Sequence, residues 1–305
     1  MFLAFAPERT VEGKALEELG RLPQIIGGHD RASVQMTANL MRELTPIIVE
    51  VESLEAAEMI KLVNNAFRDL SFAFSNELAL VCDHFNLDAA ELVRAANEGY
   101  PRNNIPAPSP GVGGVCLKKD PVMFAWVAQE AGIERPLSHM GRAVNELMPR
   151  YVARRIVGFL RENGRPLSEA RVVLAGLAFK GQPETSDVRN STAIEVLNLL
   201  KAEGVTVIGY DPVVDAETIG AVGATPCATL EDCFANADVV AILNNHESFA
   251  KINLYALLES MRRPGMFFDG WHLFPAEEAT RVEGITYAGL GLVRRGNARR
   301  RKPSA

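Results

Sequence analysis

The sequence predicts an α/β protein in which a mostly helical part precedes a doubly wound α/β domain. Between about residues 53 and 162, apolar side chains recur at spacings of three and four, which is typical of packed helices. After Arg165, short β-branched runs alternate with a helical segment instead. The length of 305 residues favours two compact units, because one hydrophobic core rarely organises so long a chain. We expect the boundary near Asn163–Pro166.

The helical part begins with one long helix, expected at residues 53–82. Its apolar positions keep helical spacing throughout: Ala57, Ile60, Val63, Ala66, Phe67, Leu70, Phe74, Leu78 and Val81. A second helix is expected at residues 88–97, and a loop rich in proline and glycine at 100–114. Further helices are expected from Pro121 to about Glu162.

In the second part, strand signals alternate with helix signals. The expected strands are residues 171–175, 205–210, 239–243 and 266–268. A helix expected at residues 191–203 joins the first two strands, and a strand–helix–strand succession produces parallel neighbours. Residues 166–293 are therefore expected to form a doubly wound domain.

Composition narrows the function classes. A net charge of −6 argues against an extended nucleic-acid surface, because phosphate binding needs an excess of Lys and Arg on one face. The basic cluster Arg294–Lys302 lacks apolar periodicity, so we expect a solvated tail. No stretch is long enough to span a bilayer, and the apolar opening Met1–Thr10 is too short for the core of a signal peptide.

Cysteines and histidines give little sign of a metal or disulfide framework. Cys82, Cys116, Cys227 and Cys233 form no CxxC pair and have no histidine at zinc-ligand spacing, so a reducing cytoplasm fits best. Except for Cys116, we expect these thiols to be structural. The five histidines show no triad or metal spacing and stay unassigned: His29, His84, His139, His246 and His272.

Cys116 lies directly after the glycine-rich bend Gly111–Gly114 and just before a helical segment, with Lys118, Lys119 and Asp120 within one turn. Backbone amides at a helix start and nearby ammonium groups stabilise a thiolate, the reactive form of cysteine. The pattern is typical of a nucleophile. An inert cysteine packed at a tight turn is the alternative, and spacing alone does not decide between them.

Three further residues suggest acid–base and oxyanion chemistry. Lys61 and Asn65 are four apart on the long helix, so their side chains share a face and could meet one developing alkoxide. A solvated lysine beside a surface asparagine is the alternative. Glu8 lies in an expected loop, where it could orient water as a general base or be an ordinary surface acid.

No strand is followed by GxGxxG with an acidic residue about 20 positions later, so the dinucleotide-binding fingerprint is not found in this sequence. The nearest string, Gly176–Gly181, lacks the middle glycine. It contains Phe179 and Lys180, which together with Arg189 could offer a stacking ring and cations to a nucleotide diphosphate. Strand-end packing and a loop ion pair with Asp187 are the alternative.

Five strings occur in an order that resembles one known family. They are PERTVEGKA, EAAEMIKLVNNAF, NEGYPRNNIPAPSPGVGGVCLKKDP, GLAFKGQPETSDVRNSTA and YDP. Together they are similar to the UDP-glucose and UDP-N-acetylhexosamine 6-dehydrogenases, whose acetylated substrates are UDP-GlcNAc and UDP-ManNAc. The likeness runs from the first residues to about Gly291, and five ordered strings are far more specific than any one alone.

The resemblance implies that the C6 hydroxymethyl of the sugar is oxidised twice by two NAD, through an adduct on a cysteine. Cys116 matches the nucleophile, which forms a thiohemiacetal and, after the second oxidation, a thioester. Lys61 and Asn65 match the residues that stabilise the oxyanions. Asp120 matches an aspartate placed near the lysine and water, and Glu8 matches the glutamate of thioester hydrolysis.

The resemblance also implies a substrate site and a partner. Phe179 and Lys180 match residues that hold the uridine diphosphate, and Lys119 and Gly113 belong to the motif beside the sugar.

Two arginines and the long helix extend this expectation. Arg102 matches an arginine that reaches across a dimer toward the partner's substrate, and Arg189 matches one that approaches NAD. The long helix would form the interface of a homodimer, with neither nucleic acid nor membrane as a partner.

The resemblance divides the chain into four segments. They are a remnant of an NAD-binding Rossmann domain at 1–49, a helical central dimerisation domain at 50–163, a Rossmann-like UDP-binding domain at 164–293 and a basic tail at 294–305. The amino-terminal Rossmann domain is thus expected to be mostly absent. Two departures stand out: Trp271 replaces an arginine that contacts substrate in many members, and the stretch between Lys180 and Arg189 is longer than in many relatives.

Three functions stay open. A dehydrogenase that makes a UDP-uronic acid is favoured by the full catalytic set, with this chain as a part of it. A truncated dimer that binds a UDP-sugar without oxidising it would explain the missing fingerprint. A 3-hydroxyacid dehydrogenase shares the general architecture but has no need of the cysteine loop. The strings PERT and LKKD point to different sugars, so the UDP-sugar itself is undecided.

Overall fold

The computed structural model describes residues 1–295. These residues form two compact units, one made of residues 1–70 and 116–140, the other of residues 71–115 and those from 141 onward. The long helix α3 (Leu54–Phe85) runs from the first unit into the second, as the apolar spacing predicts. The two units are groups of residues in mutual contact, and their boundaries fall inside helices. They therefore do not test the four-part division expected from the resemblance, which stays a proposal.

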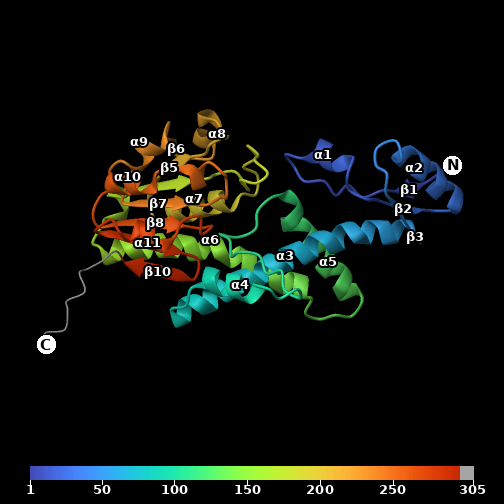
Figure 1. The fold of residues 1–305 in the computed structure, drawn as a ribbon, viewed down its shortest axis with the longest axis horizontal. Coiled ribbons are helices and arrows are strands. Elements are labelled where there is room, and N and C mark those ends of the chain that lie inside the picture. The colour runs from blue at the N-terminus through green and yellow to red at the C-terminus, as the bar shows by residue number, and fades with distance from the viewer. Residues whose placement is uncertain (296–305) are drawn as a thin grey trace. The chain divides into compact units, whose positions relative to one another are not determined.

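The first unit contains a small sheet of order β1-β2-β3 among the described residues. Its elements are β1 (Ala4–Phe5), α1 (Ala15–Leu19), β2 (Gln24–Gly28), α2 (Arg31–Met41) and β3 (Ile48–Val51), shown in blue in Figure 1. Strand β1 is antiparallel to β2, and β2 is parallel to β3 through α2. Buried Ile25 and Ile26 of β2 supply apolar surface for this unit.

Helix α5 (Val115–Glu130) begins six residues earlier than the sequence predicts. We expected the helix to start at Pro121, because proline favours the first turn. Pro121 instead lies inside α5, where it removes one backbone donor without ending the helix. As a result Cys116 lies in the first turn of α5 rather than in the loop before it.

The second unit is built on a seven-stranded sheet of order β10-β9-β8-β7-β4-β5-β6 within the described residues. Its strands are β4 (Arg171–Ala175), β5 (Thr206–Tyr210), β6 (Thr225–Pro226), β7 (Val239–Ile242), β8 (Gly265–Asp269), β9 (Ile285–Gly289) and β10 (Leu292–Arg295). All neighbours are parallel except β9 and β10. Arg294 and Arg295 therefore belong to an antiparallel strand, and the other residues of the expected basic tail lie outside the described residues.

Helices cover both faces of this sheet (Figure 1). They are α6 (Leu137–Glu162), α7 (Thr192–Ala202), α8 (Ala216–Ala221), α9 (Leu230–Phe234), α10 (Leu254–Glu259) and α11 (Ala276–Ala279), with 3₁₀ turns at Leu167–Glu169 and Phe249–Lys251. Helix α4 (Ala89–Asn97) follows α3 in the same unit. Alternate residues of β4 enter different cores, Val172 with α6 and α7, and Val173 with α9 and α10. Burial on both faces confirms the doubly wound α/β prediction.

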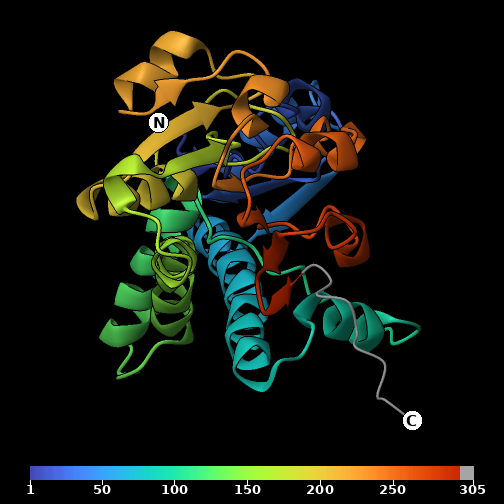
Figure 2. The same ribbon diagram turned by 90° about the vertical axis from the view of Figure 1, so that its left-hand side faces the viewer.

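Short polar signals set the ends of these helices. Ser191 accepts a hydrogen bond from Ala193 N at 3.2 Å and so caps α7, where the sequence predicted a helix start. Figure 2 shows the turn from α3 into α4, where Asn86 has a positive φ of 55° and Asp88 caps α4.

Strand β4 pairs with β5 on one side and with β7 on the other. The chain leaves β4 toward β5 and later crosses to β7, so the connections diverge between β4 and β7. In doubly wound folds, ligands bind outside the carboxyl ends of the strands at such a switch point. The loops after β4 and β7 are therefore the place to look for a ligand site in this unit.

Candidate functional site

A buried carboxylate organises a cluster of candidate catalytic residues within the first unit. Asp120 is 1% exposed, and its Oδ2 accepts a hydrogen bond from Asn65 Nδ2 at 2.6 Å. Its Oδ1 accepts a hydrogen bond from the ammonium of Lys119. A charge taken out of water needs such partners, so Asn65 and Lys119 together make Asp120 tolerable inside the unit. The hydrogen bond from Asn65 also links the long helix α3 to α5.

Glu8 and Lys61 form the second pair in this unit. The ammonium of Lys61 donates to the backbone oxygen of Glu8 and lies 3.3 Å from its Oε2. Burial raises the pKa of Glu8, but hydrogen bonds from Thr10 and the charge of Lys61 outweigh it and hold the pKa below its ordinary value. Glu8 is therefore a carboxylate at neutral pH, held by its neighbours in the loop after β1.

Lys61 and Asn65 thus share a helix face, as their spacing predicts, but each has its own carboxylate partner. Lys61 contacts Glu8, and Asn65 contacts Asp120. An amide carries two N–H donors, and an ammonium carries three. Both groups can therefore keep their carboxylate and still donate to a ligand oxygen.

Cys116 is exposed in the first turn of α5. The hydrogen bond to Asp120 raises the pKa of Lys119, and the neighbouring Cys116 contributes in the same direction. An ammonium close to the sulfur and the positive end of a 16-residue helix both favour negative charge at this position. The thiol is accessible and its surroundings suit an anionic intermediate.

The second unit contains its own candidate residues, in the glycine loop and after β4. A Cβ on Gly113 would lie 2.8 Å from Asn190 O, and one on Gly114 would lie 3.0 Å from the ring of Phe179. Gly114 also has a positive φ of 84°, which favours glycine. The loop before α5 therefore packs closely on the segment after β4, and side chains at these positions would prevent that approach.

Phe179 and Lys180 lie together after β4. The Lys180 ammonium is 5.3 Å from the centroid of the Phe179 ring, within cation–π range. Both residues are partly exposed. A ring and a cation at the carboxyl end of a parallel strand are suited to a base and a phosphate.

Asp211, at the end of β5, fixes the start of this segment. Its Oδ2 accepts from Leu177 N at 2.7 Å, from Ala178 N at 3.0 Å and from Asn244 Nδ2 at 3.2 Å. Its Oδ1 accepts from Val213 N at 2.9 Å and Val214 N at 3.2 Å. One side chain thus connects the carboxyl ends of β4, β5 and β7.

Two arginines expected at the site are held by neighbours within the second unit. The Arg189 guanidinium contacts both oxygens of Asp187, with Nη2 to Oδ2 at 2.7 Å, and this hydrogen bonding lowers the pKa of Asp187. The expected alternative of a loop ion pair is therefore present. Arg102 donates from Nε to the Tyr100 hydroxyl at 2.9 Å and stacks over its ring at 4.4 Å.

Trp271 links the loop after β8 to the loop after β7 by a hydrogen bond. Its indole N–H donates to Leu243 O at 3.0 Å, and its backbone N donates to Asp269 Oδ1 at 3.2 Å. An arginine at this position would bring a charge to the carboxyl edge of the sheet, whereas the indole brings none.

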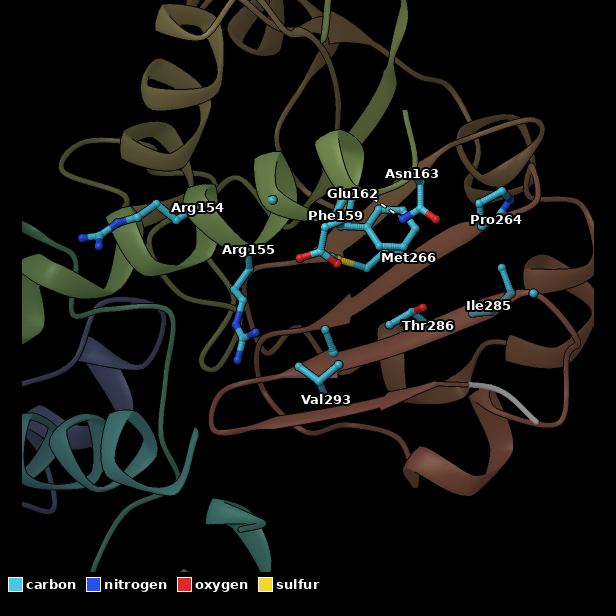
Figure 3. Close-up of a pocket in the computed structure, with 13 residues that line it drawn as sticks. Arg154, Arg155, Phe159, Glu162, Asn163, Pro264, Met266, Ile285, Thr286 and Val293 are labelled. Atoms are coloured by element: carbon cyan, nitrogen blue, oxygen red, sulfur yellow. Dashed lines mark hydrogen bonds between the residues drawn. The ribbon is translucent and has the colours of Figure 1, made fainter. Parts of the chain in front are cut away.

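A cavity of about 530 Å³ in the second unit lies at the opposite edge of the sheet. Its lining includes Phe159 and Glu162 of α6, Pro264 before β8 and Ile285 at the start of β9 (Figure 3). These strand positions are at or near amino ends. Because doubly wound folds bind nucleotides at the carboxyl ends, this cavity is not the candidate nucleotide site.

The β2–α2–β3 segment has the outline of a dinucleotide site, because a pyrophosphate binds at a helix N-terminus after a glycine-rich turn. A Cβ on Gly27 would lie 2.0 Å from Ser53 O, and one on Gly28 would lie 2.7 Å from Val34 Cγ2, so packing accounts for both glycines. Asp30 caps α2, and its hydrogen bond from the Ser33 backbone N–H lowers its pKa. A carboxylate at that position repels a pyrophosphate, so this segment does not fit NAD.

Two family models match the chain. The central domain of the UDP-glucose/GDP-mannose dehydrogenase family matches residues 55–147, and the UDP binding domain of that family matches residues 173–276. The chain belongs to the UDP-glucose/GDP-mannose dehydrogenase family. The resemblance of the five sequence strings is thereby confirmed. The second match covers the segment with Phe179 and Asp211, and the first covers the segment with Asn65 and Cys116.

Named dehydrogenases are similar to this family member. The UDP-N-acetyl-D-mannosamine dehydrogenase of Methanococcus maripaludis is 31% identical over 252 residues, 83% of this chain and 56% of the relative. The solved UDP-D-ManNAc dehydrogenase of Pyrococcus horikoshii is 31% identical with a TM-score of 0.81, over 95% of this chain and 65% of that one. A solved NDP-N-acetyl-D-galactosaminuronic acid dehydrogenase of Methanosarcina mazei Go1 is 26% identical with a TM-score of 0.83, over 95% and 62%. The chain therefore spans less than two thirds of each of these relatives.

Sequence reasoning left out the residues that link the loops of the UDP binding domain. Asp211, Asn244 and His246 hold the loops after β4, β5 and β7 together. Polar residues directly after two expected strands were the available signal, because such positions meet at one edge of a parallel sheet.

Among the described residues, no helix is long and apolar enough to cross a membrane.

Proposed function

We propose that this chain carries the substrate-binding and thiol-bearing parts of an NAD-dependent nucleotide-sugar 6-dehydrogenase, which oxidises a UDP-sugar to its UDP-uronic acid. The observation that supports this proposal most strongly is the cluster in the first unit. There Cys116 neighbours Lys119 and Asp120, and Asp120 accepts a hydrogen bond from Asn65. The names of the similar dehydrogenases favour a UDP-N-acetylhexosamine as the sugar.

NAD would accept two hydrides from C6 in this reaction. Arg189 is the proposed contact to it, and the β2–α2–β3 segment does not fit it. The steps assigned to the chain's own residues are therefore the formation of a carbon–sulfur bond and its later hydrolysis. These steps begin with the aldehyde left by the first oxidation.

Cys116 Sγ attacks the C6 aldehyde carbon, so that a carbon–sulfur bond forms and the carbonyl π electrons move to oxygen. The thiol proton passes to a nearby base or to solvent. Lys61 and Asn65 donate to the resulting oxyanion, and their carboxylate partners hold them in place before substrate arrives. Loss of hydride from this thiohemiacetal gives a thioester.

Hydrolysis then regenerates the thiol. Glu8 takes a proton from water, the water oxygen bonds to the thioester carbon, and the carbon–sulfur bond breaks to release Cys116. Glu8 is ionised at neutral pH, as this role requires, although its lowered pKa makes it a weaker base than an ordinary glutamate. Asp120 keeps Lys119 charged and orients Asn65, whose amide stays directed by its hydrogen bond.

Phe179 stacks on the uracil ring and Lys180 pairs with the diphosphate in this proposal. Their place after β4, beside the switch point, supports it, as does the match to a UDP binding domain. Gly113 lets the backbone come close to the substrate, and Arg102 reaches toward the substrate of a partner subunit.

UDP binding tests the nucleotide half of the proposal. Lys180→Ala is expected to weaken UDP binding at least about tenfold in calorimetry, because a charge-assisted phosphate contact is lost. Lys201→Ala removes a lysine on α7 as a matched control and should leave the affinity unchanged. Absence of UDP binding by the unaltered chain would contradict the proposal, whereas binding without turnover would favour the non-oxidising binding dimer.

We also propose that α3 forms the interface of a homodimer. Five large apolar side chains on it are between 43% and 70% exposed: Val63, Phe67, Phe74, Val81 and Phe85. Their spacings of four, seven, seven and four place them within an arc of about 40° at 100° per residue. Such a narrow apolar seam is typical of helix pairing and is costly to leave in water.

The dimer is tested by placing charges in this seam. Phe67→Glu combined with Phe74→Glu is expected to convert a dimer to monomers in sedimentation equilibrium, because the charges would be buried unpaired. Glu58→Lys lies about opposite the seam on the same helix and serves as the control. A monomeric unaltered chain, or a doubly substituted chain that stays dimeric, would contradict the interface.

A further inference from the structure

The segment between Lys180 and Arg189, which the resemblance predicts to be longer than in many relatives, is fixed onto the residues after β7. Gly181 N donates to Asn245 Oδ1 at 3.0 Å, and Glu184 Oε2 lies 3.1 Å from His246 Nε2. A Cβ on Gly181 would lie 2.0 Å from His246 N, so the two backbones are in direct contact. The lengthened segment is therefore tied to the β7 loop at two points.

His246 is buried, with its backbone N donating to Asn244 Oδ1 at 3.2 Å. The backbone N of Ser248 donates to its Nδ1 at 3.2 Å, and the Ser248 hydroxyl is 2.8 Å from the same atom. A nitrogen that accepts a backbone N–H carries no proton of its own, so this pattern assigns the proton to Nε2. Nε2–H therefore donates to the carboxylate of Glu184.

The same network holds the residues on both sides of Phe179 and Lys180. On the near side, Ala178 N donates to Asp211, which also accepts from Asn244. On the far side, Gly181 and Glu184 are bonded to the Asn245–His246 dipeptide. Phe179 and Lys180, the pair proposed to bind UDP, thus have one continuous set of hydrogen bonds on both sides. This set begins at the ends of β5 and β7.

From this hydrogen-bond network we infer that His246 is a positioning residue for nucleotide binding. It touches no nucleotide itself. Its hydrogen bond to Glu184 fixes the lengthened segment, and this holds Phe179 and Lys180 in the geometry that receives the base and the diphosphate. The inference rests on the proposed UDP site, and it names a residue pair that sets the affinity of that site.

The test is a double-mutant cycle on UDP affinity, measured by calorimetry. His246→Ala and Glu184→Ala are each expected to weaken UDP binding about tenfold, and the double variant no further, because both remove one hydrogen bond. His246→Gln keeps a donor near the position of Nε2 and should restore most of the affinity, whereas His246→Asn does not reach Glu184. Glu247→Ala removes a surface ion pair with Lys251 and leaves the His246–Glu184 hydrogen bond in place, so UDP affinity should stay unchanged.

Hydrogen exchange separates this inference from the UDP site itself. Without ligand, amides of residues 181–189 are expected to exchange faster in His246→Ala and Glu184→Ala than in the unaltered chain, while His246→Gln stays close to it. If the unaltered chain binds no UDP, the proposed function fails, and unchanged exchange in both alanine variants would overturn the positioning role as well. Additive losses of UDP affinity, or none, would also overturn it.

Discussion

Replacing Cys116 by serine is expected to lower formation of UDP-uronic acid by more than about three orders of magnitude. The hydroxyl is a far weaker nucleophile at neutral pH, so the carbon–sulfur adduct that precedes the second oxidation is not formed. The measurement is product formation by the protein together with any in-frame residues that precede it. UDP affinity should be retained, because the proposed uridine diphosphate contacts lie after β4.

Cys227→Ser is the matched control for this substitution. Cys227 is a partly exposed free thiol in the second unit, whose Sγ donates to Thr229 O at 3.4 Å and also interacts with the thiol of Cys233. It should leave the rate unchanged. Near-normal uronic acid formation by Cys116→Ser would exclude the covalent route.

Asp211→Ala is expected to destabilise the second unit by about 3 to 5 kcal/mol. The substitution leaves five donors without their acceptor, namely four backbone N–H groups and the amide of Asn244. Urea unfolding followed by circular dichroism measures the change. The loop with Phe179 also loses its anchor, so UDP affinity should fall with stability.

Asp215→Ala provides the comparison. Asp215 caps α8 by accepting a hydrogen bond from Thr218 N at 2.7 Å at an exposed position, so its loss should destabilise the unit much less than the loss of Asp211. If the two substitutions lowered the free energy of unfolding equally, the hydrogen bonds of Asp211 would contribute no more stability than a single helix cap.

Local sequence patterns predicted the strands β4, β5, β7 and β8 of the second unit and the helix α7. The β-branched run 171–175 and the Ser191 start of the next helix were found within a residue, because burial on both faces and a cap leave direct marks in sequence. The start of α5 was wrong, since Pro121 outweighed weaker helix signals. The short strands β1 and β10, of two and four residues, were not predicted, because so few residues carry no period.

The candidate site was predictable only in part. Helical spacing placed Lys61 and Asn65 on one face, but it could not show that Glu8 and Asp120 are their partners, because these lie more than 50 residues away in the chain. The same holds for His246 and Glu184, which are 62 residues apart. Contacts of this kind follow from how elements distant in the chain pack on one another, and no single-sequence pattern gives that packing.

The central claim is tested most directly by a single-turnover assay with NAD and a panel of UDP-glucose, UDP-GlcNAc and UDP-ManNAc. It is run on this chain and on a version that includes any in-frame residues preceding it, and UDP-uronic acid is identified by mass spectrometry. We predict uronic acid from a UDP-N-acetylhexosamine in the extended version, and its loss in Cys116→Ser. No uronic acid from any of the sugars in either version would contradict the dehydrogenase assignment and leave a protein that binds UDP without oxidising it.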